Sequence, residues 1–227
     1  MYTQSVFFWR LYMNKTVLRK MILIALLSAV SYLIVSVVRI PVVLFLKYEP
    51  KDVIITVGGF LLGPMASLCI SAVVSLLEMV TVSETGPIGC LMNFLSTCAF
   101  ACPAALLYKW RHNIKGAVAG LALGTVIMAG VMLLWNWLIT PLYLQVSRDA
   151  VEGMLLPVFL PFNLLKAGLN SALVLGLYKP LTGALRSARL LPETQGKKGG
   201  AKPGIYIFAG VLLITCILLL LVMQGKM

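Results

Sequence analysis

Long apolar runs recur along nearly the whole chain, separated by short polar segments. A helix needs roughly 20 apolar residues to cross a hydrocarbon layer about 30 Å thick. Seven runs reach or approach this length, at residues 17–38, 53–62, 65–82, 88–108, 117–142, 156–177 and 205–223. The pattern predicts an all-α integral membrane protein in which the first six runs form one helical bundle.

The composition agrees with a membrane protein. Hydrophobic residues make up 60% of the 227 residues and the mean hydropathy is +0.98, whereas soluble domains use roughly 45–50% apolar residues. Only 11% of the residues are charged, which excludes a basic nucleic-acid binder. The net charge of +12 therefore has to be interpreted by its position along the chain.

The second run, 53–62, is short for a full crossing. Gly63-Pro64 follows it directly, and a Gly-Pro pair is a turn signal between helices. Gly58 and Gly59 allow a break or a close approach at this place. We expect one tilted or irregular short span followed by a tight turn.

Basic residues gather in alternate connecting segments. Cytoplasmic segments carry an excess of Lys and Arg near the helix ends. With a cytoplasmic N-terminus, the inner segments hold Arg10, Lys15, Arg19, Lys20, Lys109, Arg111, Lys115, Lys179, Arg186, Arg189, Lys197, Lys198 and Lys202, and the outer ones hold Arg39, Lys47, Lys51, Arg148 and Lys226. This bias predicts that the N-terminus is inside and that an even number of crossings precedes residue 178.

Residues 1–16 form a separate N-terminal segment. They include the aromatic residues Phe7, Phe8, Trp9 and Tyr12, which are typical of a membrane interface. The apolar run that follows lacks the small-residue cleavage site of a removable signal peptide. We expect the segment to stay in the mature protein and the membrane domain to span 17–185.

The C-terminal part also differs from the bundle. Residues 186–204 form a basic, glycine-containing linker. The final segment, 205–227, begins with a run that is apolar nearly all round, which favours a lipid-facing helix outside the bundle.

Lys166 is the only basic side chain set deep in an apolar run. A cation at membrane depth costs on the order of 3 kcal/mol on insertion scales, so such residues face a protein interior or a pathway. Asn163, Lys166 and Asn170 share one helical face and offer donors and acceptors to a polar ligand. The alternative is a polar seam between helices.

Further polar groups lie near the predicted outer ends of the helices. Asn136 stands between two tryptophans; a belt of interfacial indoles explains the tryptophans but not the amide.

The outer segment 45–52 mixes both charge signs with aromatic residues and is either a lid over a pocket or a solvated connector. Segment 83–87 can close the same pocket. Glu78 either pairs with Lys166, contacts a ligand or reaches the interface.

Small residues on two helices allow close contact with another helix. Ala25 and Ala29 are spaced four residues apart in the first run, and Gly116, Gly120 and Gly124 repeat this spacing in the fifth. Each set forms either a docking surface for a partner or ordinary packing within the bundle.

No catalytic or metal-binding motif is present in the sequence. There is no phosphate loop, no H-E-x-x-H and no G-x-S-x-G. Cys98 and Cys102 share a helical face without further ligands, and His112 is alone in a basic loop. An enzyme is disfavoured, and the chain by itself cannot hydrolyse ATP.

Several motifs occur in an order that is known from one family. They are Leu-Lys-Tyr-Glu-Pro-Lys-Asp at 46–52, Gly-Phe-Leu-Leu-Gly-Pro at 59–64, Thr-Gly-Pro-Ile-Gly at 85–89, Met-Asn-Phe at 92–94, Asn-Trp-Leu-Ile-Thr-Pro-Leu-Tyr at 136–143 and Pro-Phe-Asn-Leu-Leu-Lys at 161–166. Over roughly residues 17–181 the chain resembles the riboflavin-specific S-components (RibU family) of energy-coupling factor (ECF) transporters.

The resemblance implies a six-helix substrate-binding subunit of an ABC-type transporter in the bacterial plasma membrane. Such a subunit captures riboflavin near the outer face. A transmembrane coupling subunit (EcfT) and two ATPases then drive its uptake. Ala25 and Ala29 match the A-x-x-x-A motif by which S-components meet the coupling subunit.

The resemblance also points to binding residues. By motif position, Asn136, Asn163 and Lys166 contact riboflavin, and the first outer loop adds Leu46, Lys47 and Tyr48. Glu78, Gly86, Asn93 and Asn170 complete the set of candidates. Riboflavin has a flat apolar ring, a pyrimidine edge and a chain of hydroxyls, so we expect binding without a metal or cofactor.

Three alternatives stay open at this point. The chain can be an S-component for another vitamin, such as a flavin analogue, thiamine or a pterin-like compound, a membrane scaffold, or an intramembrane enzyme. One departure from the family is the added run at 205–223, because a typical member ends after its sixth helix. A further crossing places the C-terminus outside unless this run lies along the membrane.

Overall fold

The protein is described here by a computed structural model that covers residues 15–82, 85–187 and 203–225. The predicted interfacial aromatics Phe7, Phe8, Trp9 and Tyr12 lie outside the described residues, as do 188–202, which make up most of the predicted linker.

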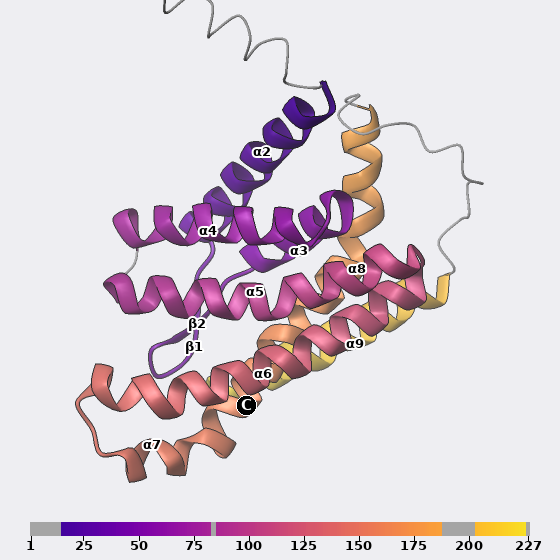
Figure 1. Ribbon diagram of the computed structural model, residues 1–227. Helices are drawn as coiled ribbons and strands as arrows, with labels where there is room; N and C mark the ends of the chain where they lie inside the picture. Colours follow the sequence, from indigo (N-terminus) through magenta and orange to yellow (C-terminus); the bar gives the residue numbers. More distant parts are fainter. Residues whose placement is uncertain (1–14, 83–84, 188–202, 226–227) are drawn as a thin grey trace, which may run out of the picture.

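The described chain is almost entirely helical (Figure 1). Its elements in order are α2 (Lys15–Val37), β1 (Ile40–Val43), β2 (Leu46–Tyr48), α3 (Lys51–Leu62), α4 (Pro64–Thr81), α5 (Gly86–Arg111), α6 (Ile114–Leu144), α7 (Arg148–Met154), the π-helical turn η1 (Leu155–Phe159), α8 (Leu160–Ser187) and α9 (Pro203–Met223). Each predicted apolar run coincides with a helical stretch, and most of the predicted ends agree with the observed ends to within a few residues.

Six helical stretches of the described chain are long and apolar enough to cross a membrane: Val17–Val37, Pro64–Thr81, Gly86–Arg111, Ile114–Leu144, Arg148–Tyr178 and Tyr206–Met223. α3 has only 12 residues and is the short span that the sequence predicts. The predicted fold class, an all-α membrane bundle with an added C-terminal helix, is confirmed.

The predicted turn between α3 and α4 falls at Gly63-Pro64. Gly63 has φ 99°, which favours glycine, and Pro64 occupies the first turn of α4, where its missing N–H costs no helical hydrogen bond.

Glycines let α5 and α6 approach each other closely. A Cβ on Gly120 would lie 2.7 Å from the carbonyl oxygen of Ala104, and one on Gly124 would lie 2.3 Å from that of Phe100. Both distances are far below contact, so these positions need glycine. Of the two interpretations of this glycine series, the structure shows packing inside the bundle.

A short β-hairpin occupies most of the first outer segment, where the sequence predicts a loop. β1 and β2 pair antiparallel, with Ile40 opposite Tyr48 and Pro41 opposite Lys47. Val42, Leu46 and Tyr48 are buried, so burial of one side of the hairpin against the helices fixes a strand conformation that its short length alone does not predict.

The last helix of the bundle starts earlier than its apolar run predicts. Ser147 caps α7, with its hydroxyl accepting a hydrogen bond of 3.4 Å from the Ala150 N–H. Pro157 lies within η1, and because proline lacks an N–H it disrupts the ordinary helical ladder. The local widening to a π-helix carries the chain from α7 into α8 without a break.

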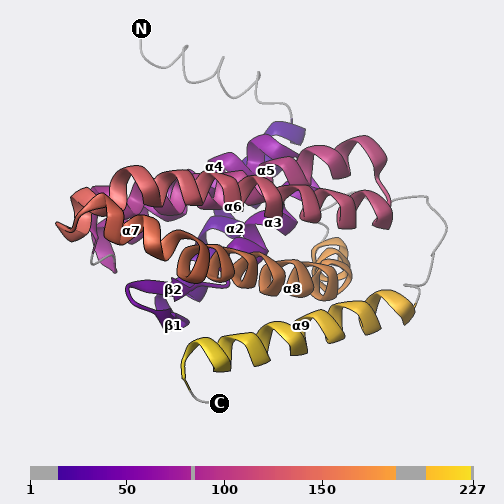
Figure 2. The ribbon, with the colours of Figure 1, turned by 90° about the horizontal axis from the view of Figure 1, so that it is seen from below.

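α9 runs back along α8 on the outside of the bundle (Figure 2). Near its start, Tyr206 lines a cavity with Tyr108, His112 and Tyr178, which lie at the end that the charge pattern assigns to the cytoplasm. Its other end reaches the β-hairpin, where the Gln224 amide donates to the carbonyl of Pro41. α9 therefore spans the same depth as α8.

Candidate functional site

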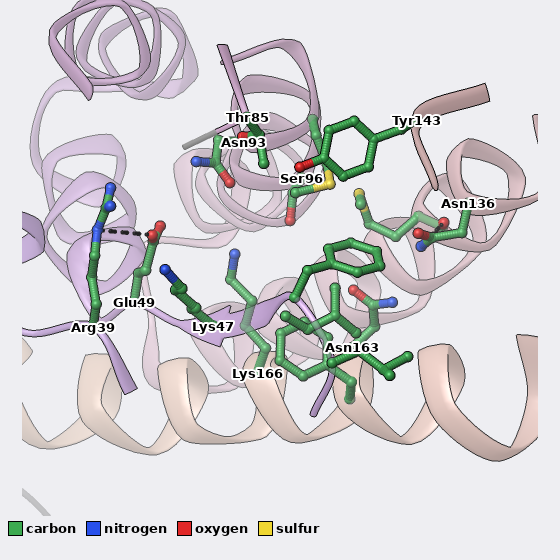
Figure 3. A pocket seen from close by; sticks show the side chains of 16 residues that line it. Arg39, Lys47, Glu49, Thr85, Asn93, Ser96, Asn136, Tyr143, Asn163 and Lys166 are labelled. Carbon is green, nitrogen blue, oxygen red and sulfur yellow. Dashed lines mark hydrogen bonds and ion pairs between the residues drawn. The ribbon is translucent and has the colours of Figure 1, made fainter. Parts of the chain in front are cut away.

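A cavity of about 230 Å³ lies at the predicted outer end of the bundle, between the β-hairpin and helices α5, α6 and α8 (Figure 3). Its wall combines aromatic and aliphatic groups with amides and charges. The lining residues are Arg39, Leu44, Phe45, Leu46, Lys47, Glu49, Thr85, Met92, Asn93, Ser96, Met132, Asn136, Tyr143, Phe162, Asn163 and Lys166.

The structure brings six of the predicted binding residues together at this cavity. Leu46 and Lys47 come from β2, Asn93 from α5, Asn136 from α6, and Asn163 and Lys166 from α8. These residues are far apart in the sequence, so their convergence is a property of the fold. Their contact with a ligand stays a prediction.

Four predicted residues do not line the cavity. Tyr48 and Asn170 are buried behind its wall, where the Tyr48 hydroxyl donates to Asn170 Oδ1 at 3.0 Å. Burial, reinforced by the charge of Asp52, raises the pKa of Tyr48, which keeps this hydroxyl protonated as a donor. Glu78 is likewise buried behind the wall, and Gly86 begins α5.

Lys166 is paired with Asp52. Lys166 Nζ lies 3.2 Å from Asp52 Oδ2, which also accepts a hydrogen bond of 3.3 Å from the Asn170 amide. The other carboxylate oxygen accepts from Thr97 Oγ1 at 2.7 Å. Asp52 is fully buried in the first turn of α3, where the helix N-terminus favours a negative charge.

Glu78 belongs to a second buried cluster around Lys51. Lys51 Nζ donates to both Glu78 oxygens at 2.6 Å and lies 2.7 Å from Glu49 Oε2. Asn93 Nδ2 also donates to Glu78, at 2.9 Å. Of the alternatives open for Glu78, the pairing with Lys166 is therefore wrong: Lys166 pairs with Asp52.

Lys51 and Asp52 are adjacent at the start of α3, and together they hold the surrounding elements in place. Lys51 ties α3 to α4 through Glu78 and to the hairpin segment through Glu49. Asp52 ties it to α5 through Thr97 and to α8 through Lys166. Charges that are buried at this depth need such partners, because an unpaired ion is costly to bury.

The amides of Asn136 and Asn163 are each anchored on their own helix. Asn136 Nδ2 donates to the Met132 carbonyl and Asn163 Nδ2 to the Phe159 carbonyl, both at 2.7 Å. Thr140 Oγ1 donates to Asn136 Oδ1 at 2.9 Å. These bonds fix the orientation of both side chains at the cavity wall, so they are preorganised groups.

Aromatic rings form the apolar part of the wall. Phe45, in the hairpin turn, meets Tyr143 of α6 edge-on at 6.0 Å between ring centroids and Phe159 at 6.2 Å. Such edge contacts are favourable. Phe159 lies behind the wall, and a flat apolar ligand can lie among Phe45, Tyr143 and the methionines Met92 and Met132.

A charged rim borders the cavity at the hairpin. Arg39 Nε lies 3.4 Å from Glu49 Oε1 (Figure 3), and Arg39 Nη1 also donates to the carbonyl of Val82. Glu49 in turn contacts Lys51, so the rim is continuous with the buried cluster.

Sequence reasoning missed several lining residues. Six of them lie inside or beside the recognised motifs, so motif position is an available signal for Phe45, Glu49, Thr85, Met92, Tyr143 and Phe162. The sequence identifies Arg39 only as an outer charge. Leu44, Ser96 and Met132 also line the cavity, and their residue types alone carry no signal for a site.

Ala25 and Ala29 lie on α2, are not among the lining residues of the cavity, and are both exposed. They therefore do not pack inside the described bundle.

Among the described residues, no three His, Cys, Asp or Glu side chains are grouped so as to hold a metal ion.

Comparison with known proteins places this geometry in a family. The family model described as "ECF transporter, substrate-specific component" matches residues 19–178, a range that contains every lining residue of the cavity. A solved structure of the S component of a bacterial ECF transporter superposes with a TM-score of 0.61 at 28% identity, covering 74% of this chain and 97% of that one.

Curated relatives are similar over most of their length. The riboflavin transporter RibU of Staphylococcus aureus is 26% identical over 177 residues, 74% of this chain and 93% of the relative. The riboflavin transporter FmnP of Bacillus subtilis is 26% identical over 65% of this chain and 84% of the relative. RibU of Streptococcus thermophilus is 28% identical over 80% of this chain and 91% of the relative. This chain belongs to the substrate-specific components of ECF transporters, multi-pass proteins of the bacterial cell membrane.

Proposed function

We propose that this chain is the riboflavin-binding subunit of an ECF transporter and captures the vitamin at the outer face of the membrane. The observation that carries the proposal is the convergence of Asn136, Asn163 and Lys166 with an aromatic wall in one cavity. Three relatives that are similar over most of their length are riboflavin transporters, which supports the same ligand.

The chemistry of the wall suits each part of riboflavin. Its flat ring matches the aromatic and aliphatic groups around Phe45 and Phe162. Its pyrimidine edge needs donors and acceptors, which the fixed amides of Asn136 and Asn163 supply. Its hydroxyl chain suits the charged rim of Arg39 and Glu49, because hydrogen bonds to charged groups are stronger than neutral ones.

The cavity is small for a ligand of this size, which supports a movement of the hairpin on binding. Sites for drug-sized ligands have volumes of about 300–1,000 Å³, and the present volume is about 230 Å³. The hairpin supplies Leu44, Phe45, Leu46 and Lys47 to the wall, whereas most of the other lining residues lie in helices. An outward shift of the hairpin therefore admits the ligand.

Riboflavin titration tests the binding function. Purified full-length protein in mild detergent should quench riboflavin fluorescence with a nanomolar Kd, equivalent to about −12 kcal/mol. Thiamine and a pterin serve as competitors and should leave the riboflavin signal unchanged. The proposal fails if riboflavin neither quenches nor raises the unfolding temperature, and displacement by thiamine or the pterin would reassign the vitamin.

We further propose that the exposed face of α2 around Ala25 and Ala29 binds the transmembrane coupling subunit, EcfT, which acts with two ATPase subunits. Small side chains allow the backbone of another helix to approach closely. ATP hydrolysis then lies entirely in the partner subunits, and this chain has no catalytic role.

Bulky substitutions separate this docking face from the pocket. Ala25→Trp and Ala29→Trp should abolish uptake in cells and co-purification with the coupling subunit, while the riboflavin Kd of the purified protein stays unchanged. Val37→Trp is the matched control, because Val37 is 82% exposed at the other end of the same helix. Uptake at the control level in both alanine variants would contradict the proposal.

A further inference from the structure

The last helix lies beyond the part of the chain that the family accounts for. The family match ends at residue 178, and 74% of this chain suffices to cover 97% of the solved S component. A binding pocket of this kind is therefore complete without α9. The role of α9 has to be inferred from its own contacts.

One side of α9 is fitted closely to α8. Cys216 is only 6% exposed, and a Cβ added to Gly168 of α8 would lie 2.7 Å from its sulfur atom. Ala209 is buried as well. Small residues at such contacts let two helices pack tightly in a membrane.

The opposite side of α9 faces away from the protein. Ile207 is 66% exposed, Val211 58% and Ile214 60%. The predicted lipid-facing character therefore holds for this side only. The other side belongs to the protein core, so α9 is a docked part of the fold.

The far end of α9 reaches the hairpin that closes the pocket. Gln224 Nε2 donates to the Pro41 carbonyl at 2.6 Å, and Pro41 is paired across the hairpin with Lys47, which lines the cavity. Leu220 and Met223 pack against the cluster of buried residues that includes Leu46. The helix thus holds the hairpin by a polar contact and an apolar contact.

We propose that α9 positions the β-hairpin over the pocket and slows the release of riboflavin, with Gln224 as the positioning residue. This inference rests on the proposed riboflavin-binding function. If the hairpin moves outward when the ligand enters or leaves, the Gln224–Pro41 bond and the packing of α9 on α8 both oppose that movement. α9 is then a support for the hairpin that lies outside the region matched by the family model.

Two kinds of variant of the full-length protein test whether α9 holds the hairpin over the pocket. Gln224→Ala and Gln224→Glu both remove the amide donor, the second with little change in size. Each should release radiolabelled riboflavin roughly threefold to fivefold faster in a chase with excess unlabelled riboflavin, as expected for the loss of one hydrogen bond. Cys216→Phe should have a larger effect, because the ring displaces α9 from Gly168.

Ile214→Phe is the matched control for the bulky substitution, since it adds a ring on the exposed side of the same helix. It should release riboflavin at the wild-type rate. Unfolding temperatures without riboflavin show whether a variant is folded, and Gln224 lies at the surface, so its variants are expected to fold.

The two hypotheses fail in different ways. If wild-type protein binds no riboflavin, the proposed function fails. If wild-type protein binds riboflavin and the Gln224 and Cys216 variants release it at the wild-type rate, the proposed support by α9 is overturned.

Discussion

Lys166 Nζ and Asp52 Oδ2 lie 3.2 Å apart, and both side chains are buried. The pair explains how a cation is tolerated deep in an apolar helix. Asp52 balances the charge, and the Thr97 hydroxyl and the Asn170 amide satisfy the remaining acceptor sites of the carboxylate. Lys166 can therefore line the cavity with its ammonium group held in place.

Asp52→Ala should be strongly destabilising. Removing one partner of a buried ion pair costs about 3–5 kcal/mol, because the other charge is left unpaired. The variant should unfold at a lower temperature in detergent and bind riboflavin more weakly. Asp149→Ala, which removes an exposed carboxylate in α7, is the control and should behave like wild type. A wild-type unfolding temperature for Asp52→Ala would contradict the assigned pairing.

The order of the helices was predictable from the sequence because hydrocarbon thickness dictates the length of an apolar run. The hairpin and α7 were not. β1 and β2 have four and three residues, too few for a periodic pattern, and they are stabilised by burial against distant helices. The start of α7 depends on the Ser147 cap and on polar residues that no hydropathy pattern detects.

Part of the candidate site was also predictable. Asn163, Lys166 and Asn170 share a helical face because of their spacing, which is a local property. The partner of Lys166 was not predictable, because Asp52 and Glu78 are both plausible carboxylates and only the packing of α3 decides between them. In the same way Asn170 lies on the predicted face yet contacts Tyr48 and Asp52 behind the wall.

Asn136→Ala and Lys166→Met should weaken riboflavin binding. Each removes a polar group from the cavity wall, and an unpaired ligand group costs about 1–3 kcal/mol, or roughly fivefold to more than a hundredfold in Kd. Lys166→Met also leaves the buried Asp52 without its cation, so its unfolding temperature should fall as well. Fluorescence titration measures this directly. Thr125→Ala is a control on the same helix as Asn136 but away from the cavity. An unchanged Kd in both variants would assign these residues to helix packing instead.

Gly124→Leu should disrupt the contact between α5 and α6. A Cβ at this position would lie 2.3 Å from a backbone carbonyl, which cannot move away without shifting a helix, and overpacking costs about 1–3 kcal/mol or more. The unfolding temperature should fall and the yield of folded protein should drop. Gly130→Leu, on the same helix with no atom within 4 Å of the added Cβ, should be tolerated. Equal behaviour of the two variants would exclude close packing at Gly124.

Lys51 and Glu78 should show strong energetic coupling. Lys51→Met leaves Glu49 and Glu78 near each other without the cation that lies between them, and Glu78→Leu leaves Lys51 with one carboxylate. Each single variant should be destabilised by about 3 kcal/mol or more, whereas replacing both partners by apolar side chains of similar volume is often close to neutral. The double variant should therefore be more stable than the sum of the single effects predicts. Unfolding temperatures and denaturant titrations of the four proteins measure the coupling, and strictly additive effects would show that the pair does not stabilise the start of α3.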